Sequence, residues 1–446
     1  MFNPVEGMKS EMDFFVPPLT SKQISESKYI WFQPRAPIEN SEVIEFLIEG
    51  IADQYIDLSK TKLHITGKFV NSSTNADLKD EEMYCPVNLL FHALFKQADV
   101  LLNDKQITHG SQTYPYKAYL EKLLSFNQSA KDSTLQTSFY YEDAADNFNS
   151  VTYGDENPGA KIRHNLTKGS KSIQMSDKLH LDAFNIDRYI IGNVKVALKL
   201  TRSKPEFYTM RASQSNTGAA GAAANSSPVV FKIEDIKLKV FKIKPTSNLL
   251  MAHATMLLKT PANYIINNVQ TKVYNVATGS QAIDLENIFL GRIPARIIAL
   301  MIDVRAYEGD YSLNPFYFKH NHINNLYILK DGVQYPSQPY QPDFPAGKCL
   351  APYEDMLECL DLWGRNKSNG ITLDKYKKGF TFFMWDLTAD MSASSNIFNS
   401  AIQGTVSFHC KFSTALTSNI NLFIYGESKH IMQITLNGDV AVDYTV

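Results

Sequence analysis

Apolar and polar residues alternate with a period of two along much of this chain. Such alternation is typical of a β-strand that buries one face and leaves the other wetter, as in antiparallel sheets. The inward side chains that it predicts are Val194, Val196, Leu198 and Leu200 in residues 194–201, Leu63, Ile65 and Phe69 in residues 61–69, and Val406, Phe408, Cys410 and Phe412 in residues 405–412. The pattern favours an antiparallel β protein.

The strand pattern of residues 233–245 contains a phase slip. Apolar residues alternate with lysines up to Val240, and Phe241 then takes over the apolar phase. One extra residue in a strand produces such a slip, so we expect a β-bulge or a bend near Val240 and Phe241. The strand must end by Pro245, which has no amide proton for the ladder.

Helical patterns are scarce. The best begins at Pro115, a residue suited to a first helical position, and its apolar residues recur at helical spacing. These residues are Tyr116, Tyr119, Leu120, Leu123 and Leu124. Residues 86–95 are a second, weaker candidate. Residues 127–170 are polar and predict long loops, and residues 213–228 form an Ala/Ser/Gly-rich segment of low complexity.

A hairpin pattern occurs twice. Residues 325–336, NLYILKDGVQYP, place Asp331-Gly332 between two apolar runs, which is a strong type I′ turn signal. Residues 99–110, DVLLNDKQITHG, carry the weaker Asn103-Asp104 in the same setting. The offset is 331 − 104 = 227, close to half of the 446 residues, so a duplicated β unit is indicated.

The length supports the same division. A chain of 446 residues exceeds what one hydrophobic core usually serves. A fresh series of strand patterns opens after residues 244–257. We therefore predict an all-β protein made of two tandem, eight-stranded antiparallel jelly rolls with a few short helices in loops. Its predicted parts are an N-terminal arm at 1–27, a first jelly roll at 28–247 and a second at 248–446.

Composition excludes several classes of partner. The net charge is −2, so the chain lacks the basic field that holds nucleic acid, and we expect no direct sequence-specific nucleic-acid binding. The first 18 residues lack the basic, apolar and small-residue sections of a signal peptide. No apolar run approaches the 18 residues of a membrane-spanning helix, so we expect none. The four cysteines suit a reducing compartment, with Cys410 expected as a buried core thiol.

The search for catalytic chemistry finds little. His320 and His322 would share one face of a strand and could form a metal pair, but no carboxylate follows at the spacing of a jelly-roll metal enzyme. Surface or interface histidines are the favoured interpretation. Phosphate-binding glycine loops and nucleophile elbows are missing from the sequence. We predict no enzyme, no cofactor and no metal ligand, and favour a building block or binding scaffold.

Several segments, in order, resemble one family. The most specific is YSLNPFYFKHNHINNLYILKDGVQYPSQPYQPDF at residues 311–344, together with YPYKAYLEKLLSF at 114–126. The others are residues 10–25, 29–38, 48–70, 86–107 and 187–204. Together they resemble the double-jelly-roll major capsid (hexon) protein of Polinton/Maverick elements and adintoviruses, copies of which lie integrated in many animal genomes. The match runs from about residue 10 to the end and misses the 210–228 insertion.

The resemblance implies a structural function. Three chains with two jelly rolls each would form a trimer with a pseudo-hexagonal outline, and such trimers would tile an icosahedral viral shell. The implied partners are further copies of the chain and penton or minor capsid proteins. The implied location is the virion, with synthesis inside the host cell and no secretion by a signal peptide.

Aromatic residues are the candidate contacts between subunits, because obligate interfaces favour them. They are Phe14 and Phe15 in the arm, and Tyr311, Phe316, Tyr317 and Phe318 in the second half. The alternative for the second group is the sandwich core. We expect the arm to lie extended along a neighbour or the inner face of the shell.

Three alternative functions remain open at this point. A penton or minor capsid protein is the close competitor, although such proteins usually carry one jelly roll. A tandem jelly-roll carbohydrate-binding protein would need exposed aromatics and carboxylates on a concave sheet. A jelly-roll metalloenzyme would use His320 and His322.

Overall fold

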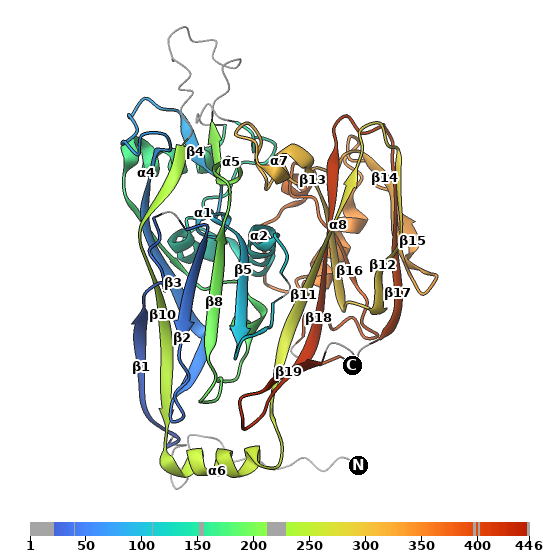
Figure 1. Cartoon of the computed structure of the whole chain (residues 1–446). Helices are drawn as coiled ribbons and strands as arrows, with labels where there is room; N and C mark the ends of the chain where they lie inside the picture. Colours follow the sequence, from blue (N-terminus) through green and yellow to red (C-terminus); the bar gives the residue numbers. More distant parts are fainter. Residues whose placement is uncertain are drawn as a thin grey trace, which may run out of the picture.

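The chain forms two β-sandwiches that stand side by side (Figure 1). The computed structural model describes residues 22–39, 41–108, 110–150, 156–211, 229–395, 398–399 and 402–443. Every strand pair within the four main sheets is antiparallel and stays within one half of the chain. The two halves therefore have separate sheets, each facing its own core.

The first sandwich consists of two four-stranded sheets, with orders β1-β10-β3-β7 and β2-β8-β5-β6. Its strands are β1 (Ile24–Phe32), β2 (Val43–Ile48), β3 (Tyr55–Asn71), β5 (Phe95–Leu102), β6 (Lys105–Gln106), β7 (Ile173–Asp177), β8 (Val196–Arg202) and β10 (Val229–Pro245). A small separate sheet joins β4 (Tyr84–Pro86) to β9 (Thr209–Arg211).

The second sandwich has the orders β11-β18-β13-β16 and β12-β17-β14-β15, and β19 also pairs with β18. Its strands are β11 (Ala262–Val276), β12 (Ala282–Arg292), β13 (Arg296–Asp303), β14 (Ile323–Lys330), β15 (Val333–Tyr340), β16 (Phe383–Asp386), β17 (Gln403–Phe412), β18 (Ile420–Ile434) and β19 (Val440–Asp443).

Both halves have the same topology. When the main strands are numbered in chain order within each half, leaving out β4, β9 and β19, one sheet has the order 1-8-3-6 and the other 2-7-4-5, in both halves. Two facing antiparallel sheets of this kind form a jelly roll. The prediction of two tandem jelly rolls is confirmed.

The two predicted hairpins occupy equivalent places. Asp331 and Gly332 have φ of 49° and 77° between β14 and β15, and Asn103 and Asp104 have φ of 45° and 65° between β5 and β6. Positive φ at both central residues is the signature of a type I′ turn. The first turn forms without glycine because Asn and Asp tolerate the left-handed region better than other residues. Each hairpin joins the fourth and fifth strands of its jelly roll.

The predicted strand patterns are also found. Every side chain expected to point inward from residues 61–69, 194–201 and 405–412 is buried. Pairing of β10 with β3 shifts register between Lys239 and Phe241, but the extra residues lie in β3, between Asp57 and Lys62. The extra residue predicted in β10 is not found there, because Val240 and Phe241 pair with β1 without a shift. The strand ends at Pro245, as predicted. One boundary differs from its prediction. β1 begins at Ile24, so residues 24–27 of the predicted arm belong to the first sheet.

Helices are more extensive than the sequence predicted. They are α1 (Leu90–Ala93), α2 (Tyr114–Ser125), α3 (Gln128–Lys131), α4 (Pro158–Thr167), α5 (Pro205–Tyr208), α6 (Ser247–Leu257), α7 (Val304–Glu308), α8 (Leu350–Cys359) and α9 (Leu373–Lys377). α2 matches the prediction. α4 lies within residues 127–170, which were expected to be loops, and the Asn157 side chain caps it by accepting from Ala160 N at 3.2 Å.

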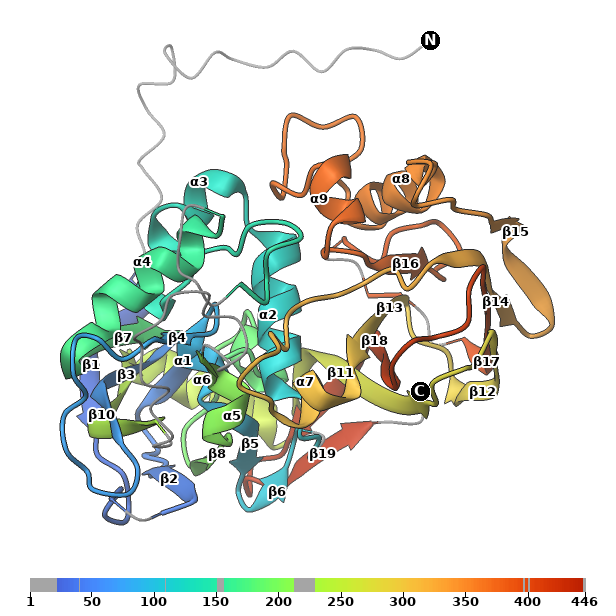
Figure 2. The same ribbon diagram turned by 90° about the horizontal axis from the view of Figure 1, so that it is seen from above.

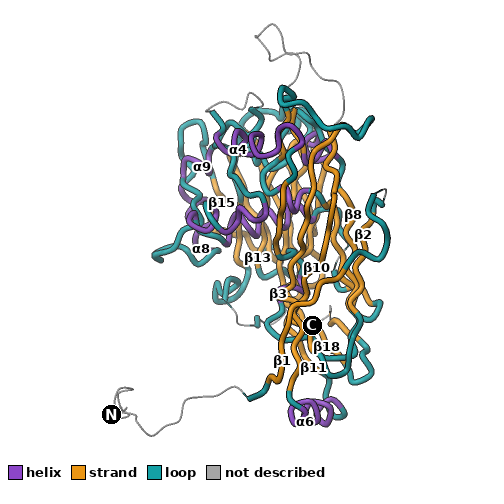
Figure 3. Tube along the Cα trace, turned by 90° about the vertical axis from the view of Figure 1, so that its left-hand side faces the viewer, coloured by secondary structure: helices purple, strands orange, loops and turns teal. Residues whose placement is uncertain are grey.

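The helices have distinct places. α3, α4, α8 and α9 lie together on one side of the sandwiches (Figures 2 and 3). α6 connects the two halves and lies across one end of the molecule (Figure 1). Within the described part of the chain, no helix is both long enough and apolar enough to span a bilayer.

The β14–β15 turn yields a first prediction. A Cβ at Gly332 would meet nothing within 4 Å, so Gly332→Ala isolates the conformational cost of the positive φ. We expect a loss of about 1 kcal/mol in the free energy of unfolding, measured by urea denaturation. Gly110→Ala, where the added Cβ makes only ordinary contacts, is the control. Equal midpoints for the two variants would contradict the type I′ assignment.

Candidate functional site

The junction between the two sandwiches is built on α2. Tyr119 stacks on Phe316 of the second half with ring centroids 4.2 Å apart and planes 2° apart. Tyr116 contacts Phe423 of β18 and Tyr307 of α7 at 5.4 and 5.5 Å. Such aromatic pairs contribute roughly 0.5–1.5 kcal/mol each beyond the burial of their surface. The junction thus has an aromatic core of its own.

α2 is buried on more than one side. Besides its apolar residues, Lys117 and Lys122 are buried. Lys117 forms an ion pair with Asp182, whose second carboxylate oxygen accepts from Val269 N of β11 at 3.5 Å. A helix buried all round lies inside a structure rather than on its surface.

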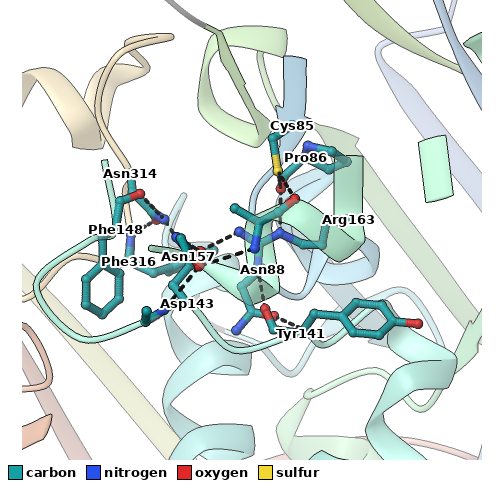
Figure 4. Close-up of polar contacts among 12 residues, drawn as sticks. Cys85, Pro86, Asn88, Tyr141, Asp143, Phe148, Asn157, Arg163, Asn314 and Phe316 are labelled. Carbon is teal, nitrogen blue, oxygen red and sulfur yellow. Dashed lines mark hydrogen bonds and ion pairs between the residues drawn. The ribbon is translucent and has the colours of Figure 1, made fainter. Parts of the chain in front are cut away.

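A buried polar network crosses the junction at Asp143 (Figure 4). Arg163 of α4 donates from Nη2 to Asp143 Oδ1 at 2.5 Å, and Asn157 donates from Nδ2 to the same oxygen at 2.9 Å. Asn314 of the second half donates from Nδ2 to Asp143 Oδ2 at 3.1 Å and to Phe148 O at 3.2 Å. One carboxylate therefore binds groups from both halves.

The network is buried and its charges are paired. The side chains of Arg163 and Asp143 are both 0% exposed. Burial alone would lower the pKa of Arg163, but the neighbouring Asp143 carboxylate outweighs it and raises that pKa. Arg163 also donates from Nε to Pro86 O at 2.8 Å. Breaking such a pair costs about 3–5 kcal/mol, because it leaves an uncompensated buried charge.

Further polar contacts join the loops around the junction. Lys131 of α3 is buried and donates from Nζ to Asn369 O at 2.5 Å, and burial lowers its pKa to about 8. Lys375 of α9 forms an ion pair with Glu142. Asn103, in the first type I′ turn, donates from Nδ2 to Gly438 O at 2.6 Å. Contacts from end to end thus hold the two jelly rolls as one body.

The predicted contact residues of the second half lie at this junction. Phe316 and Phe318 are fully buried within the chain, so here they are core side chains and not a surface for a second subunit. Tyr317 stacks on Phe148 at 4.7 Å, and Tyr311 donates to Glu206 at 3.3 Å. These contacts all join the two halves. Phe14 and Phe15 lie outside the described residues.

The two histidines considered as a metal pair do not lie on a strand. Asn321 and His322 have φ of 44° and 54°, so a turn precedes β14. His320 stacks on Phe344 with centroids 4.2 Å apart, and His322 N donates to His320 Nδ1 at 3.0 Å. Among the described residues, the group of three potential metal ligands lies elsewhere, in the first sandwich.

α6 presents an apolar surface. Its sequence, SNLLMAHATML, holds no charged residue, and none of its residues is buried. Met251 and Met256 are 71% and 57% exposed, and the adjoining Leu258 is 73% exposed. Exposed apolar patches of this kind typically mark interaction sites.

The comparisons with known proteins agree with this architecture. A chain of the Sputnik virophage superposes with a TM-score of 0.67 at 10% identity, covering 100% of this chain and 94% of that one. The mavirus major capsid protein gives a TM-score of 0.53 at 13% identity, covering 100% and 96%. The Faustovirus major capsid protein gives 0.54 at 10% identity, covering 94% and 92%. The chain has the double-jelly-roll fold.

Sequence comparison adds a relative without a described activity. "Uncharacterized protein F54H12.2" of Caenorhabditis elegans is 24% identical over 416 residues, which covers 90% of this chain and 93% of that protein. No protein-family model matches the chain. The chain thus covers more than nine-tenths of the length of the proteins compared with it above.

The aromatic contacts of the junction should stabilise the protein and make the two jelly rolls unfold together. Phe316→Ala should lower the free energy of unfolding by about 3–5 kcal/mol, because it leaves a cavity beside Tyr119. Calorimetry should then show the two jelly rolls melting in separate transitions. Phe316→Leu, which keeps most of the volume, is the control and should stay close to the wild type. A single transition at the wild-type temperature in Phe316→Ala would refute the role of this contact.

The stability of the folded chain should depend on pH through His320. Burial, and then the neighbouring His322, lower the pKa of His320 from 6.5 to about 4. As the pH falls through this window, the unfolded chain takes up a proton that the folded chain does not, so stability is lost. The urea midpoint of the wild type should drop more between about pH 7 and about pH 5 than that of His320→Gln. Equal drops would show that His320 titrates normally.

Proposed function

We propose that this chain is a major capsid protein whose trimers form pseudo-hexagonal capsomers and tile an icosahedral shell. The observation that carries the proposal is the doubled jelly roll locked at Asp143 and α2, in a chain that matches viral major capsid proteins over nearly its full length. The proposed activity is assembly and not catalysis.

The geometry suits this function physically. A chain with two equivalent jelly rolls presents two similar corners, so three chains provide six. The corners keep their relative positions only if the two rolls cannot rotate against each other. The buried ion pair and the stacked rings of the junction supply that rigidity. Subunit contacts are then made by loops and by exposed surfaces such as α6.

The finer proposal is a capsid protein of the Polinton/Maverick and adintovirus kind. It is supported by the ordered segments that resemble this family, among them residues 114–126 and 311–344. A relative of similar length in Caenorhabditis elegans is what an element integrated in animal genomes would leave. The proposed partners are further copies of the chain and penton or minor capsid proteins. The proposed location is the virion, after synthesis inside the host cell.

The oligomeric state tests the proposal. Size-exclusion chromatography with light scattering should give a particle of three times the 50.3 kDa chain mass. Negative-stain images of the same fraction should show hexagonal outlines, because each chain contributes two similar rolls. A strict monomer at high concentration, or trimers with a three-lobed outline, would contradict it.

A further inference from the structure

Three potential metal ligands converge in the first jelly roll. They are His92 of α1, Asp177 at the end of β7, and His180 in the loop that follows. One ligand atom from each lies within 4.8 Å of the others, and His92 Nε2 is 3.2 Å from Asp177 Oδ2. Two imidazoles and a carboxylate form a ligand set that suits zinc and similar divalent ions.

Each histidine is oriented through its other nitrogen. His92 Nδ1 lies 2.8 Å from the Tyr114 hydroxyl, and His180 Nδ1 lies 2.5 Å from Glu121 Oε2, both on α2. Metal-binding histidines are held in this way, since a partner on one ring nitrogen fixes the tautomer and directs the other nitrogen to the ion. The nitrogens left for a metal are His180 Nε2 and His92 Nε2, the latter facing the Asp177 carboxylate.

His180 provides the second observation. Its Nε2 atom is buried and has no hydrogen-bond partner, while the side chain as a whole is 11% exposed. A buried polar atom without a partner is costly, so natural proteins rarely leave one. Its ring packs edge-on against that of His92, with centroids 5.0 Å apart.

We infer that His92, Asp177 and His180 bind a divalent transition-metal ion of the zinc class, with Glu121 and Tyr114 as positioning residues. The ion has a structural role. It links α1 to β7 and the loop that follows, and Tyr114 and Glu121 connect these ligands to α2, the helix on which the second jelly roll packs. The inference does not depend on the proposed function, because the whole site lies within the first jelly roll.

Lys122 is the competing cation. Its Nζ lies 2.9 Å from Asp177 Oδ2, and also 4.8 Å from the ring centroid of Phe126. If no metal is bound, the Lys122 ammonium is the cation that neutralises the charge of the Asp177 carboxylate. With a metal bound, it remains over the Phe126 ring and repels the ion. Loss of the lysine charge should therefore destabilise a cluster without metal, but should strengthen metal binding in a cluster that holds an ion.

The test begins with the purified full-length chain. It is stripped with a chelator, incubated with Zn²⁺ alone, dialysed, and analysed for bound metal and melting temperature. We expect stoichiometric zinc and a higher melting temperature than in the stripped protein. Wild-type protein that retains no zinc and melts unchanged would overturn the inference.

Variants assign the metal to this cluster. His180→Ala should lose the zinc, whereas His322→Ala, in the histidine pair before β14, should retain it. Glu121→Gln keeps all three ligands and should weaken zinc binding by about 10–100-fold. Lys122→Met should tighten zinc binding. If His180→Ala does not fold, the opposite shifts in Glu121→Gln and Lys122→Met decide the question. Equal zinc binding in these variants and the wild type would overturn the inference.

Discussion

The Asp143 carboxylate is the point on which the arrangement of the two jelly rolls depends. It is buried, and Arg163 and Asn157 hold it from the first half while Asn314 binds it from the second. A buried charge of this kind tolerates few geometries, because each unpaired oxygen or nitrogen costs several kcal/mol. The aromatic contacts of α2 supply area around it, and the ionic network restricts how the halves can meet.

This junction joins the two copies of the fold. Two copies of one topology, with strand orders 1-8-3-6 and 2-7-4-5, would be two independent domains if a mobile linker joined them. Here α2 and the loops around Asp143 lie between them, and α4 reaches Asp143 through Arg163. The insertions that distinguish the chain from a minimal pair of jelly rolls are thus the parts that join its two halves into one unit. The inferred metal site would hold α2 to the first jelly roll through Tyr114 and Glu121.

Much of each jelly roll could be predicted from residue patterns. The buried residues of β3, β8 and β17 and both type I′ turns follow from local rules, because strand alternation and turn chemistry act over a few residues. α4 was missed since its helical signal is a short cap, Asn157-Pro158, within a polar segment. The roles of Phe316 and Phe318 could not be read, because aromatic residues serve cores and interfaces alike.

The sequence by itself determined the fold class, the duplication and the buried faces of several main strands, since these depend on periodicity and local backbone preferences. Only the tertiary structure decided what lies between the halves. Asp143 and Asn314 are 171 residues apart, and His92 and Asp177 are 85 apart, so no spacing links them. Such contacts exist only after long loops have folded back, because a site made of distant residues depends on the packing of every element that carries them.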